Sequence, residues 1–318
     1  MKHHVTRGRG LLLSAIVAMA VQFAAPVASA EYEEGTVRFG TPTWPGVTVK
    51  TEVAARIMEA MGYQTRSTNA SPAFAINSLK TDDLDVYLGG WMPTEKHMIE
   101  PAQEKGEVEV LATNISGAIM GIAVPEYVWN AGVRSEADLA EHADKFNSKI
   151  YGIEAGSGFN DSIKSAIGND RHGLGGWELV PSSTSAMLSQ VGRKIDRDEW
   201  IVFLGWTPHW MNVTYDIKYL KAVGEPKIAD TRSDVLTVVN PKLRERAPEV
   251  AKFLGQYVVD KQHQSTWVLE YSYNDREKGA VASEWIAANL DTVAEWLDGV
   301  KTRDGQPAIE AVREAYDQ

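Results

Sequence analysis

Short β-prone runs alternate with stretches of helical periodicity from Thr36 onward, and this alternation limits the possible folds more than any other feature of the chain. The first strand is predicted at residues 36–40. A helix is predicted at residues 48–61, because apolar side chains recur at helical spacing from Val49 to Met61 and Gly62 can end the helix. Strands that alternate with helices indicate βαβ units and a mixed or parallel sheet. We therefore predict an α/β fold.

The alternation continues along the chain and predicts two lobes. Further strands are expected at residues 85–88, 107–112, 121–125, 150–153 and 200–204, and further helices at residues 75–79, 159–167, 185–193, 250–259, 277–289 and 291–297. We place the lobe boundaries near Thr113 and Leu220, so that residues 31–113 and 221–318 build lobe 1 and residues 114–220 build lobe 2. Ligands of open α/β sheets bind at the carboxyl ends of strands, so a site is expected there.

The first thirty residues have the pattern of a secretory signal peptide. Charged residues come first, an apolar stretch follows at residues 11–25, and Ala28-Ser29-Ala30 forms a cleavage site. The apolar stretch is shorter than the roughly 20 residues that a membrane-spanning helix needs. We expect cleavage between Ala30 and Glu31 and export to the periplasm.

The absence of cysteine excludes disulfides, a thiol nucleophile and a lipid-modified cysteine anchor in this chain. A free periplasmic protein is therefore expected, and we predict a monomer. Removal of the three positive charges of the signal peptide takes the net charge from −11 to about −14. Such an acidic balance argues against nucleic acid as a partner.

Three of the ten tryptophans share a context: each follows an apolar strand pattern and precedes a proline by one or two residues. These are Trp44, Trp91 and Trp206, which we expect in rigid loops at strand ends. A methylated nitrogen has no N–H to donate, so a quaternary ammonium is held by ring quadrupoles, worth roughly 0.5 to 2 kcal/mol per ring. The three tryptophans are therefore predicted to form an aromatic cage for such a cation.

Four segments resemble those of the choline and glycine betaine binding proteins of ABC importers. They are Leu88-Gly-Gly-Trp-Met-Pro-Thr, Tyr151-Gly-Ile-Glu-Ala-Gly, Gly173-Leu-Gly-Gly-Trp-Glu-Leu-Val and Ile201-Val-Phe-Leu-Gly-Trp-Thr-Pro-His-Trp-Met-Asn. The similarity runs from about Val37 to Leu220 and more loosely beyond. It implies a two-lobed periplasmic binding protein fold of type II, each lobe a mixed sheet flanked by helices, with the ligand in the interlobe cleft. It also implies delivery of the ligand to an inner-membrane ABC permease.

Two departures from the choline-specific members bear on the ligand. Those members resemble this chain but carry an acidic residue where it has Gly46, and a tyrosine at the position of Met120. A thioether packs against methyl groups but supplies no aromatic quadrupole. Loss of the acid suits a ligand that ends in a carboxylate, and Gly46 and Val47 lead into a helix whose N-terminal N–H groups can bind an anion.

Three further residues are predicted to contact the ligand. His209 is expected to donate a charge-assisted hydrogen bond to the carboxylate, unless it is bonded to the backbone. Ser157 and Asn160 are expected to supply polar contacts from lobe 2, although Asn160 suits a helix N-cap equally well.

Other functions remain open as alternatives. An enzyme that acts on a quaternary amine would need a catalytic motif, and the chain has no nucleophile elbow, no phosphate-binding loop and no metal-ligand spacing among its seven histidines. We expect no enzyme, no metal and no cofactor. A sugar-binding protein would need Asp, Asn and Arg around the tryptophans, which are flanked by Gly, Pro, Met and Thr instead. The sequence does not choose among glycine betaine, carnitine, choline and proline betaine.

Overall fold

The computed structural model describes residues 1–3, 33–224, 228 and 232–316, and every element below lies within residues 33–316. The predicted signal peptide and its cleavage site lie outside the described residues, apart from Met1 to His3. Across the described part of the chain, no helix has the length and apolar character that crossing a membrane requires.

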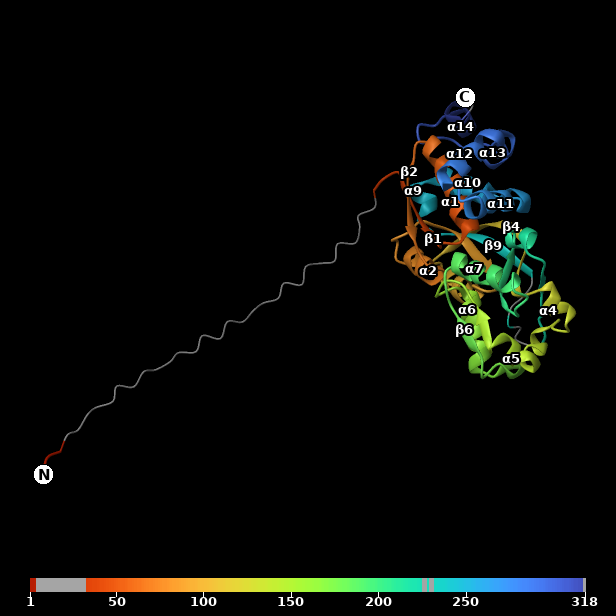
Figure 1. The fold of residues 1–318 in the computed structure, drawn as a ribbon. Helices are drawn as coiled ribbons and strands as arrows, with labels where there is room; N and C mark the ends of the chain where they lie inside the picture. Colours follow the sequence, from red (N-terminus) through yellow and green to blue (C-terminus); the bar gives the residue numbers. More distant parts are fainter. Residues whose placement is uncertain (4–32, 225–227, 229–231, 317–318) are drawn as a thin grey trace. The chain divides into compact units, whose positions relative to one another are not determined.

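The strands form one mixed sheet (Figure 1). They are β1 (Thr36–Thr41), β2 (Gln64–Asn69), β3 (Val86–Met92), β4 (Glu109–Pro125), β5 (Lys149–Tyr151), β6 (Glu178–Val180), β7 (Phe203–Thr207), β8 (Ile217–Tyr219) and β9 (Arg232–Val239). Their order is β2-β1-β3-β9-β4-β7-β5-β6, and β8 pairs with β4 off this path. Strands β1, β2 and β3 therefore lie at one end of the described sheet, and β5 and β6 lie at the other.

The sheet has an antiparallel centre between two parallel ends. β1 pairs in parallel with β2 and β3 at one end, and β5 pairs in parallel with β6 and β7 at the other. β9 and β4 lie between the two ends and pair antiparallel with their neighbours. The predicted α/β class with a mixed sheet is confirmed.

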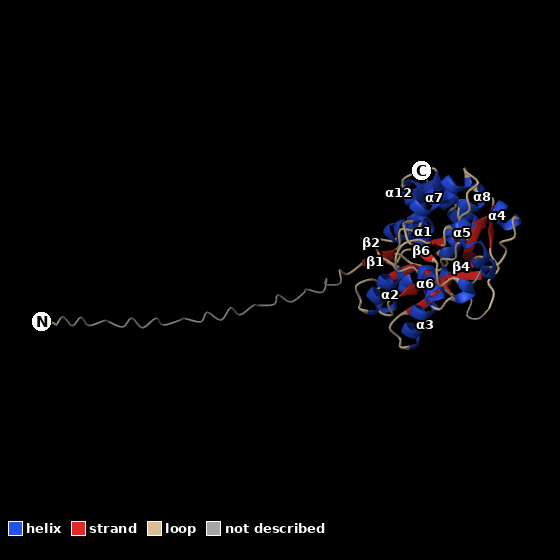
Figure 2. Ribbon diagram, turned by 60° about the horizontal axis from the view of Figure 1, so that its bottom comes forward, coloured by secondary structure: helices blue, strands red, loops and turns tan. Residues whose placement is uncertain are grey.

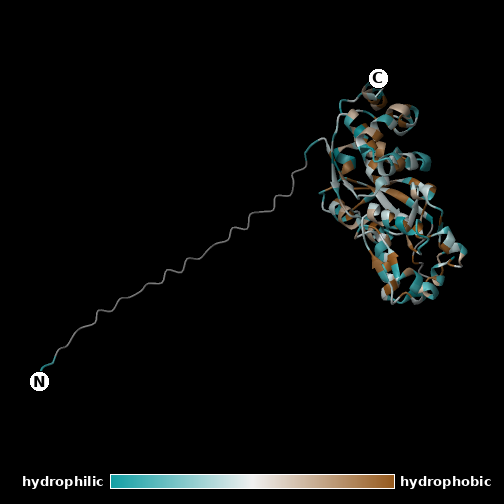
Figure 3. Ribbon diagram, in the orientation of Figure 1, coloured by the Kyte–Doolittle hydropathy of each residue, from teal (hydrophilic) through white to brown (hydrophobic). Residues whose placement is uncertain are grey.

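Helices cover this sheet (Figure 2). The longer ones are α1 (Pro45–Ala60), α2 (Pro72–Lys80), α3 (Lys96–Glu104), α6 (Gly158–Gly168), α7 (Thr184–Ile195), α10 (Pro248–Gln256), α11 (Lys261–Val268), α12 (Lys278–Ala288), α13 (Leu290–Trp296) and α14 (Ala308–Tyr316). The shorter ones are α4 (Glu126–Asn130), α5 (Ala143–Phe146), α8 (Met211–Thr214) and α9 (Leu243–Arg246). Hydrophobic and hydrophilic bands alternate along many of these helices (Figure 3), as expected for helices that pack one face against a core.

Helix α1 begins three residues earlier than the sequence predicts. Trp44 is its N-cap, with extended backbone, and Pro45 is its first residue, where a missing N–H costs nothing. Gly62 follows the last turn with φ +89°, a conformation that glycine adopts without strain. α1 packs against α11 and α12, so residues about two hundred positions apart in the sequence lie together along this helix.

The prediction of two separate strands at residues 107–112 and 121–125 is wrong, because β4 includes residues from both segments. It is one strand of 17 residues, and its pairing with β9 shifts register between Val110 and Ala112, between Thr113 and Ile115, and between Ile115 and Ala118. These irregularities bend the strand where the sequence pattern breaks. Its first part pairs with β9 and its last part with β7 and β8, so β4 connects the two ends of the sheet.

Most of the buried apolar side chains form one cluster. It includes Val53 of α1, Ile122 of β4, Phe203 of β7 and Val250 of α10, and therefore draws on both predicted lobes. A smaller cluster packs α2 and α3 against β3.

Candidate ligand-binding site

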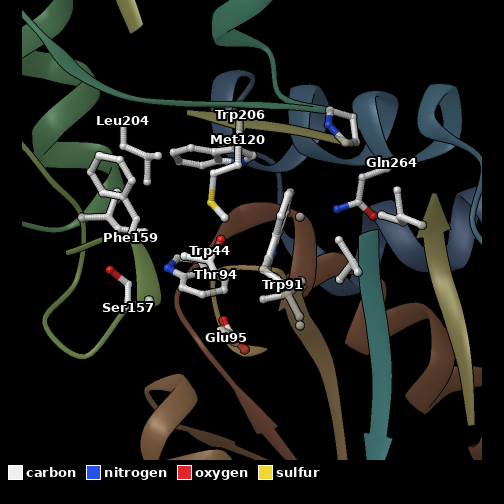
Figure 4. A pocket seen from close by; sticks show the side chains of 18 of the residues that line it. Trp44, Trp91, Thr94, Glu95, Met120, Ser157, Phe159, Leu204, Trp206 and Gln264 are labelled. Atoms are coloured by element: carbon white, nitrogen blue, oxygen red, sulfur yellow. The ribbon is translucent and has the colours of Figure 1, made fainter. Parts of the chain in front are cut away.

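The three tryptophans converge on one cavity with an empty volume of about 620 Å³, part of it open to solvent. Trp44, Trp91 and Trp206 surround a common space in Figure 4, and the Met120 thioether points into it. Trp44 and Trp206 retain only 8% and 7% of their accessible surface, so they line an internal cavity rather than an outer face. A cavity of this size suits a small ligand.

Sheet pairing explains why two of these tryptophans meet. Trp91 lies opposite Val235 of β9, and Val235 lies opposite Ile115 of β4. Further along β4, Met120 lies opposite Trp206 of β7. All five side chains line the cavity, so four neighbouring strands form one of its walls.

The predicted loop positions of Trp91 and Trp206 are wrong. Trp91 lies in β3 and Trp206 in β7, while Trp44 is the N-cap of α1. Strands hold side chains more rigidly than loops do, because neighbouring strands fix the backbone by hydrogen bonds. The strand positions therefore strengthen the case for a preformed cage.

A fourth aromatic ring lines the cavity, and the sequence analysis does not identify it. Phe159, in the first turn of α6, is buried and lies beside Leu204 across the cavity from Trp91 (Figure 4). Together with Met120 it makes this side apolar. Phe159 follows Ser157 and Gly158 in a turn that is predicted to contact the ligand. This position could have identified Phe159 as a lining residue from the sequence.

A carboxylate fixes the orientation of Trp44. The Trp44 indole N–H donates to Oε2 of Glu154 at 2.9 Å, and the Thr43 hydroxyl donates to Oε1 at 2.9 Å. The same carboxylate accepts from the Thr184 N–H at 2.9 Å and from the Thr184 hydroxyl at 3.2 Å. Glu154 therefore joins the start of α1 to the start of α7 and orients one wall of the cage.

The base of the cavity contains polar groups from α1 and α11. Gly46, Val47 and Lys50 line it from the first turns of α1, and Gln264 lines it from α11. No side chain caps the N-terminus of α1, so its first N–H groups have no acceptor within the helix. Lys50 donates to Oδ1 of Asn114 at 2.5 Å, and burial lowers the pKa of its ammonium to about 7.

Glu95 also lines the cavity, at the end nearest Trp44 and Thr94 in Figure 4. Burial raises the pKa of its carboxyl well above the usual value. The Tyr87 hydroxyl donates to the Gly89 carbonyl at 2.6 Å and lies 3.1 and 3.2 Å from the two Glu95 carboxyl oxygens. Glu95 thus belongs to a buried polar cluster beside the cage.

Seven of the nine residues predicted to contact the ligand line the cavity. They are Trp44, Gly46, Val47, Trp91, Met120, Ser157 and Trp206. The two that do not are His209 and Asn160, and each has a different role.

The charge-assisted bond predicted for His209 is not found in this structure, because its imidazole is neutral and does not line the cavity. Its buried Nε2 has no hydrogen-bond partner among the described residues. Its Nδ1 accepts a hydrogen bond from the Met211 N–H at 3.2 Å. Its ring lies 4.8 Å from that of Trp206 and 5.2 Å from that of Trp210, centroid to centroid. Burial lowers its pKa to about 3, so no imidazolium is available at neutral pH to pair with a carboxylate. His209 therefore packs against the ring of Trp206.

Asn160 is a structural residue, and it is not the helix N-cap. Ser157 is the N-cap of α6, and its Oγ accepts from the Asn160 N–H at 3.3 Å. The Asn160 side-chain amide donates to the Ile153 carbonyl at 2.8 Å and to the Glu154 carbonyl at 3.1 Å, and its Oδ1 accepts from the Ile153 N–H at 3.2 Å. These bonds hold the turn that carries Glu154.

No group of three or more histidine, aspartate or glutamate side chains in the described residues is arranged to hold a metal ion. The polar side chains of the site are an amide, hydroxyls, the Lys50 amine and the Glu95 carboxyl. This set can accept and orient a small charged or polar molecule by hydrogen bonds.

A mixed α/β fold with a tryptophan-lined cavity of this kind defines a solute-binding protein of the type II periplasmic class, and solved structures of that class match it. A choline binding protein of an ABC transporter, in complex with choline, superposes with a TM-score of 0.85 at 34% identity, over 89% of this chain and 98% of that one. Lactococcal OpuAC, in a closed conformation with glycine betaine, superposes with a TM-score of 0.74 at 28% identity, over 83% of this chain and 99% of that one.

The chain belongs to the OpuAC family, the substrate binding domain of the ABC-type glycine betaine transport system, whose model matches residues 35–288. A curated relative is the glycine betaine/carnitine transport binding protein GbuC of Listeria monocytogenes, 33% identical over 172 residues. That match covers 54% of this chain and about half, 55%, of the relative. The family acts outside the cytoplasm, in transport and together with a permease.

Proposed function

We propose that this protein captures a carboxylated betaine, such as glycine betaine, in the periplasm and presents it to the inner-membrane permease of an ABC importer. The protein acts as a monomer and by binding alone, with no covalent step. The observation that carries the proposal is the convergence of Trp44, Trp91 and Trp206 on one cavity whose base presents donor groups. Ring faces suit the methylated cation, and N–H donors suit the carboxylate.

The two predicted lobes, residues 31–113 with 221–318 and residues 114–220, give this proposal a mechanism. Trp44 and Trp91 belong to the first lobe and Trp206 to the second, so a bound ligand bridges them. Contacts across the two segments support this arrangement: Glu154 accepts from Thr43 and Trp44. Hinge closure around a ligand is how such proteins present solute to a permease.

Choline is the second candidate, because a choline complex superposes on this chain with a TM-score of 0.85. Carnitine is a third, since a carnitine-binding relative is 33% identical over part of the chain. Neither alternative changes the transport role. Each differs from glycine betaine at the end of the molecule away from the methylated nitrogen.

Isothermal titration of residues 31–318 with glycine betaine, carnitine and choline tests the proposal, with tryptophan emission followed in parallel. We expect micromolar or tighter binding of glycine betaine, which corresponds to about −8 kcal/mol or more, and a change in emission as the ring faces are covered. Stronger binding of choline than of either carboxylated ligand would refute the betaine assignment. Absence of binding to all three would refute the cage.

A further inference from the structure

The cavity is chemically asymmetric, with apolar and aromatic side chains around its centre and polar side chains at its base. Trp91, Trp206, Met120 and Phe159 make the walls around the centre, whereas Lys50 and Gln264 are the polar side chains contributed by α1 and α11. A quaternary ammonium between the rings leaves the other end of the ligand to meet a polar group elsewhere in the cavity.

Gln264 occupies the space that a side chain at position 46 would need. A Cβ built on Gly46 would lie 2.1 Å from the Gln264 Nε2, so the absence of a side chain there admits the amide. Gln264 is 5% exposed, and its Oε1 is buried without a hydrogen-bond partner among the described residues. Figure 4 shows its amide nitrogen directed toward the Trp91 side of the cavity. The Nε2 is the donor that this amide offers to a ligand, whereas the Oε1 is an acceptor and does not bind a carboxylate.

Lys50 lies one turn further along α1 and is 1% exposed. An ammonium has three donors, and one of them bonds to Oδ1 of Asn114. The Asn114 amide is itself fixed, because its Nδ2 donates to the Leu88 carbonyl at 3.2 Å and to the Thr237 hydroxyl at 3.0 Å. Within the part of the chain that the structure describes, no carboxylate forms an ion pair with Lys50.

Among the described residues, Glu95 is the carboxyl group that lines the cavity, and it forms no ion pair with Lys50. Glu95 is buried and lies within hydrogen-bond distance of the Tyr87 hydroxyl, and burial raises the pKa of its carboxyl. Thr94 and Ser157, the other polar side chains of the lining, carry no charge. Lys50 therefore has no charged partner among the described lining residues, and a carboxylate on the ligand can supply one.

We propose that Lys50 and Gln264 are specificity-determining residues that bind the ligand end opposite the methylated cation and select a carboxylate over a hydroxyl. This assignment rests on the proposed function, since it requires the cation to be held by the tryptophans. The first N–H groups of α1, at Gly46 and Val47, add a partial positive charge at the same end. A zwitterion places its negative end against these donors, whereas choline would bring a second cation near Lys50 without neutralising it.

Titration of glycine betaine and choline into the wild-type protein and two variants tests this assignment. Lys50→Met removes the charge at similar length, and Gln264→Glu keeps the shape but places a carboxylate at the base. We expect the wild-type protein to prefer glycine betaine. Each variant should lower the betaine-to-choline affinity ratio by roughly 10- to 100-fold, the size of a lost charge-assisted hydrogen bond. Choline affinity should hold or increase in both.

Matched controls separate this effect from unfolding and from failure of the cage. Lys105→Met and Gln103→Glu make the same changes at exposed positions on or beside α3 and should keep the wild-type ratio. Trp206→Ala should lose both ligands alike. Because Lys50 and Gln264 lie on different helices, either variant decides the question if the other does not fold.

An unchanged affinity ratio in folded Lys50→Met and Gln264→Glu would overturn the assignment and leave the proposed function intact. A wild-type preference for choline would also overturn it. If the wild-type protein bound neither ligand, the proposed function would fail first and the assignment with it.

Discussion

Replacement of Glu154 by glutamine should weaken glycine betaine binding by roughly 10- to 100-fold without unfolding the protein. The carboxylate accepts two bonds at each oxygen: Thr43 and the Thr184 N–H at one, Trp44 and the Thr184 hydroxyl at the other. An amide has one acceptor oxygen, so in either orientation a ring or backbone N–H loses its partner. Loss of a hydrogen bond to a charged group costs about 1.5–3 kcal/mol, which is a factor of about 10 to 100 in affinity.

The loss should appear in binding, because Glu154 orients the Trp44 ring that lines the cavity. The assay is isothermal titration of wild-type, Glu154→Gln and Glu141→Gln proteins, with thermal unfolding of each apo protein as a check on the fold. Glu141 is exposed in the same predicted lobe and serves as the matched control. Equal affinity of the wild-type and Glu154→Gln proteins would refute the view that this carboxylate orients the cage.

Three further predictions concern other parts of the site. Trp91→Leu should weaken glycine betaine binding about tenfold or more, because leucine lacks a ring quadrupole. Thermal unfolding should change little, because Trp91 is only partly buried. Equal affinities of the two proteins by titration would contradict this prediction. Asn160→Ala should lower the free energy of unfolding in urea by roughly 2 kcal/mol or more, because two buried hydrogen bonds to residue 153 and one partly buried bond to residue 154 are lost. An unchanged unfolding midpoint would contradict this. Lys50→Met should raise the melting temperature of the apo protein most below pH 7, because burial lowers the Lys50 pKa from 10.5 to about 7 and the folded wild-type protein must then bury a charge. That difference should shrink as the pH rises from 7 toward 10.5, and a difference that grew with pH would refute the buried-charge argument.

Hydrophobic periodicity in the sequence predicts the positions of several helices. The helical spacing after Trp44 predicted α1 to within three residues at its start, and α7 and α12 began within one residue of their predicted positions. β4 was not predicted as one strand, because its irregular pairing with β9 disturbs the alternation that marks a strand. The apolar run at Val235 to Val239 contains a strand signal, yet its antiparallel place between β3 and β4 depends on contacts far along the chain.

The cage was predictable because its residues share a sequence context, whereas the polar end of the site was not. Lys50 follows Gly46 by four residues and so lies on the same face of α1, which is a signal, but a lysine in a helix is ordinarily solvated. Gln264 has no local signature, and Glu154 lies in the segment of residues 151–156 that carries part of the family resemblance but does not reveal its role. Gln264 reaches the cavity because α11 packs on α1, and Glu154 acts through Trp44, more than a hundred residues away. His209 differs, because the contacts that pack its ring include its sequence neighbours Trp206 and Trp210.

A crystal structure of residues 31–318 with glycine betaine tests the central claim most directly. We predict that the methylated nitrogen lies between Trp44, Trp91 and Trp206, and that the carboxylate points to Lys50, Gln264 and the N-terminus of α1. A ligand bound outside the three rings would contradict the cage. A ligand bound between the rings with its carboxylate toward Phe159 would contradict the assignment of the polar end.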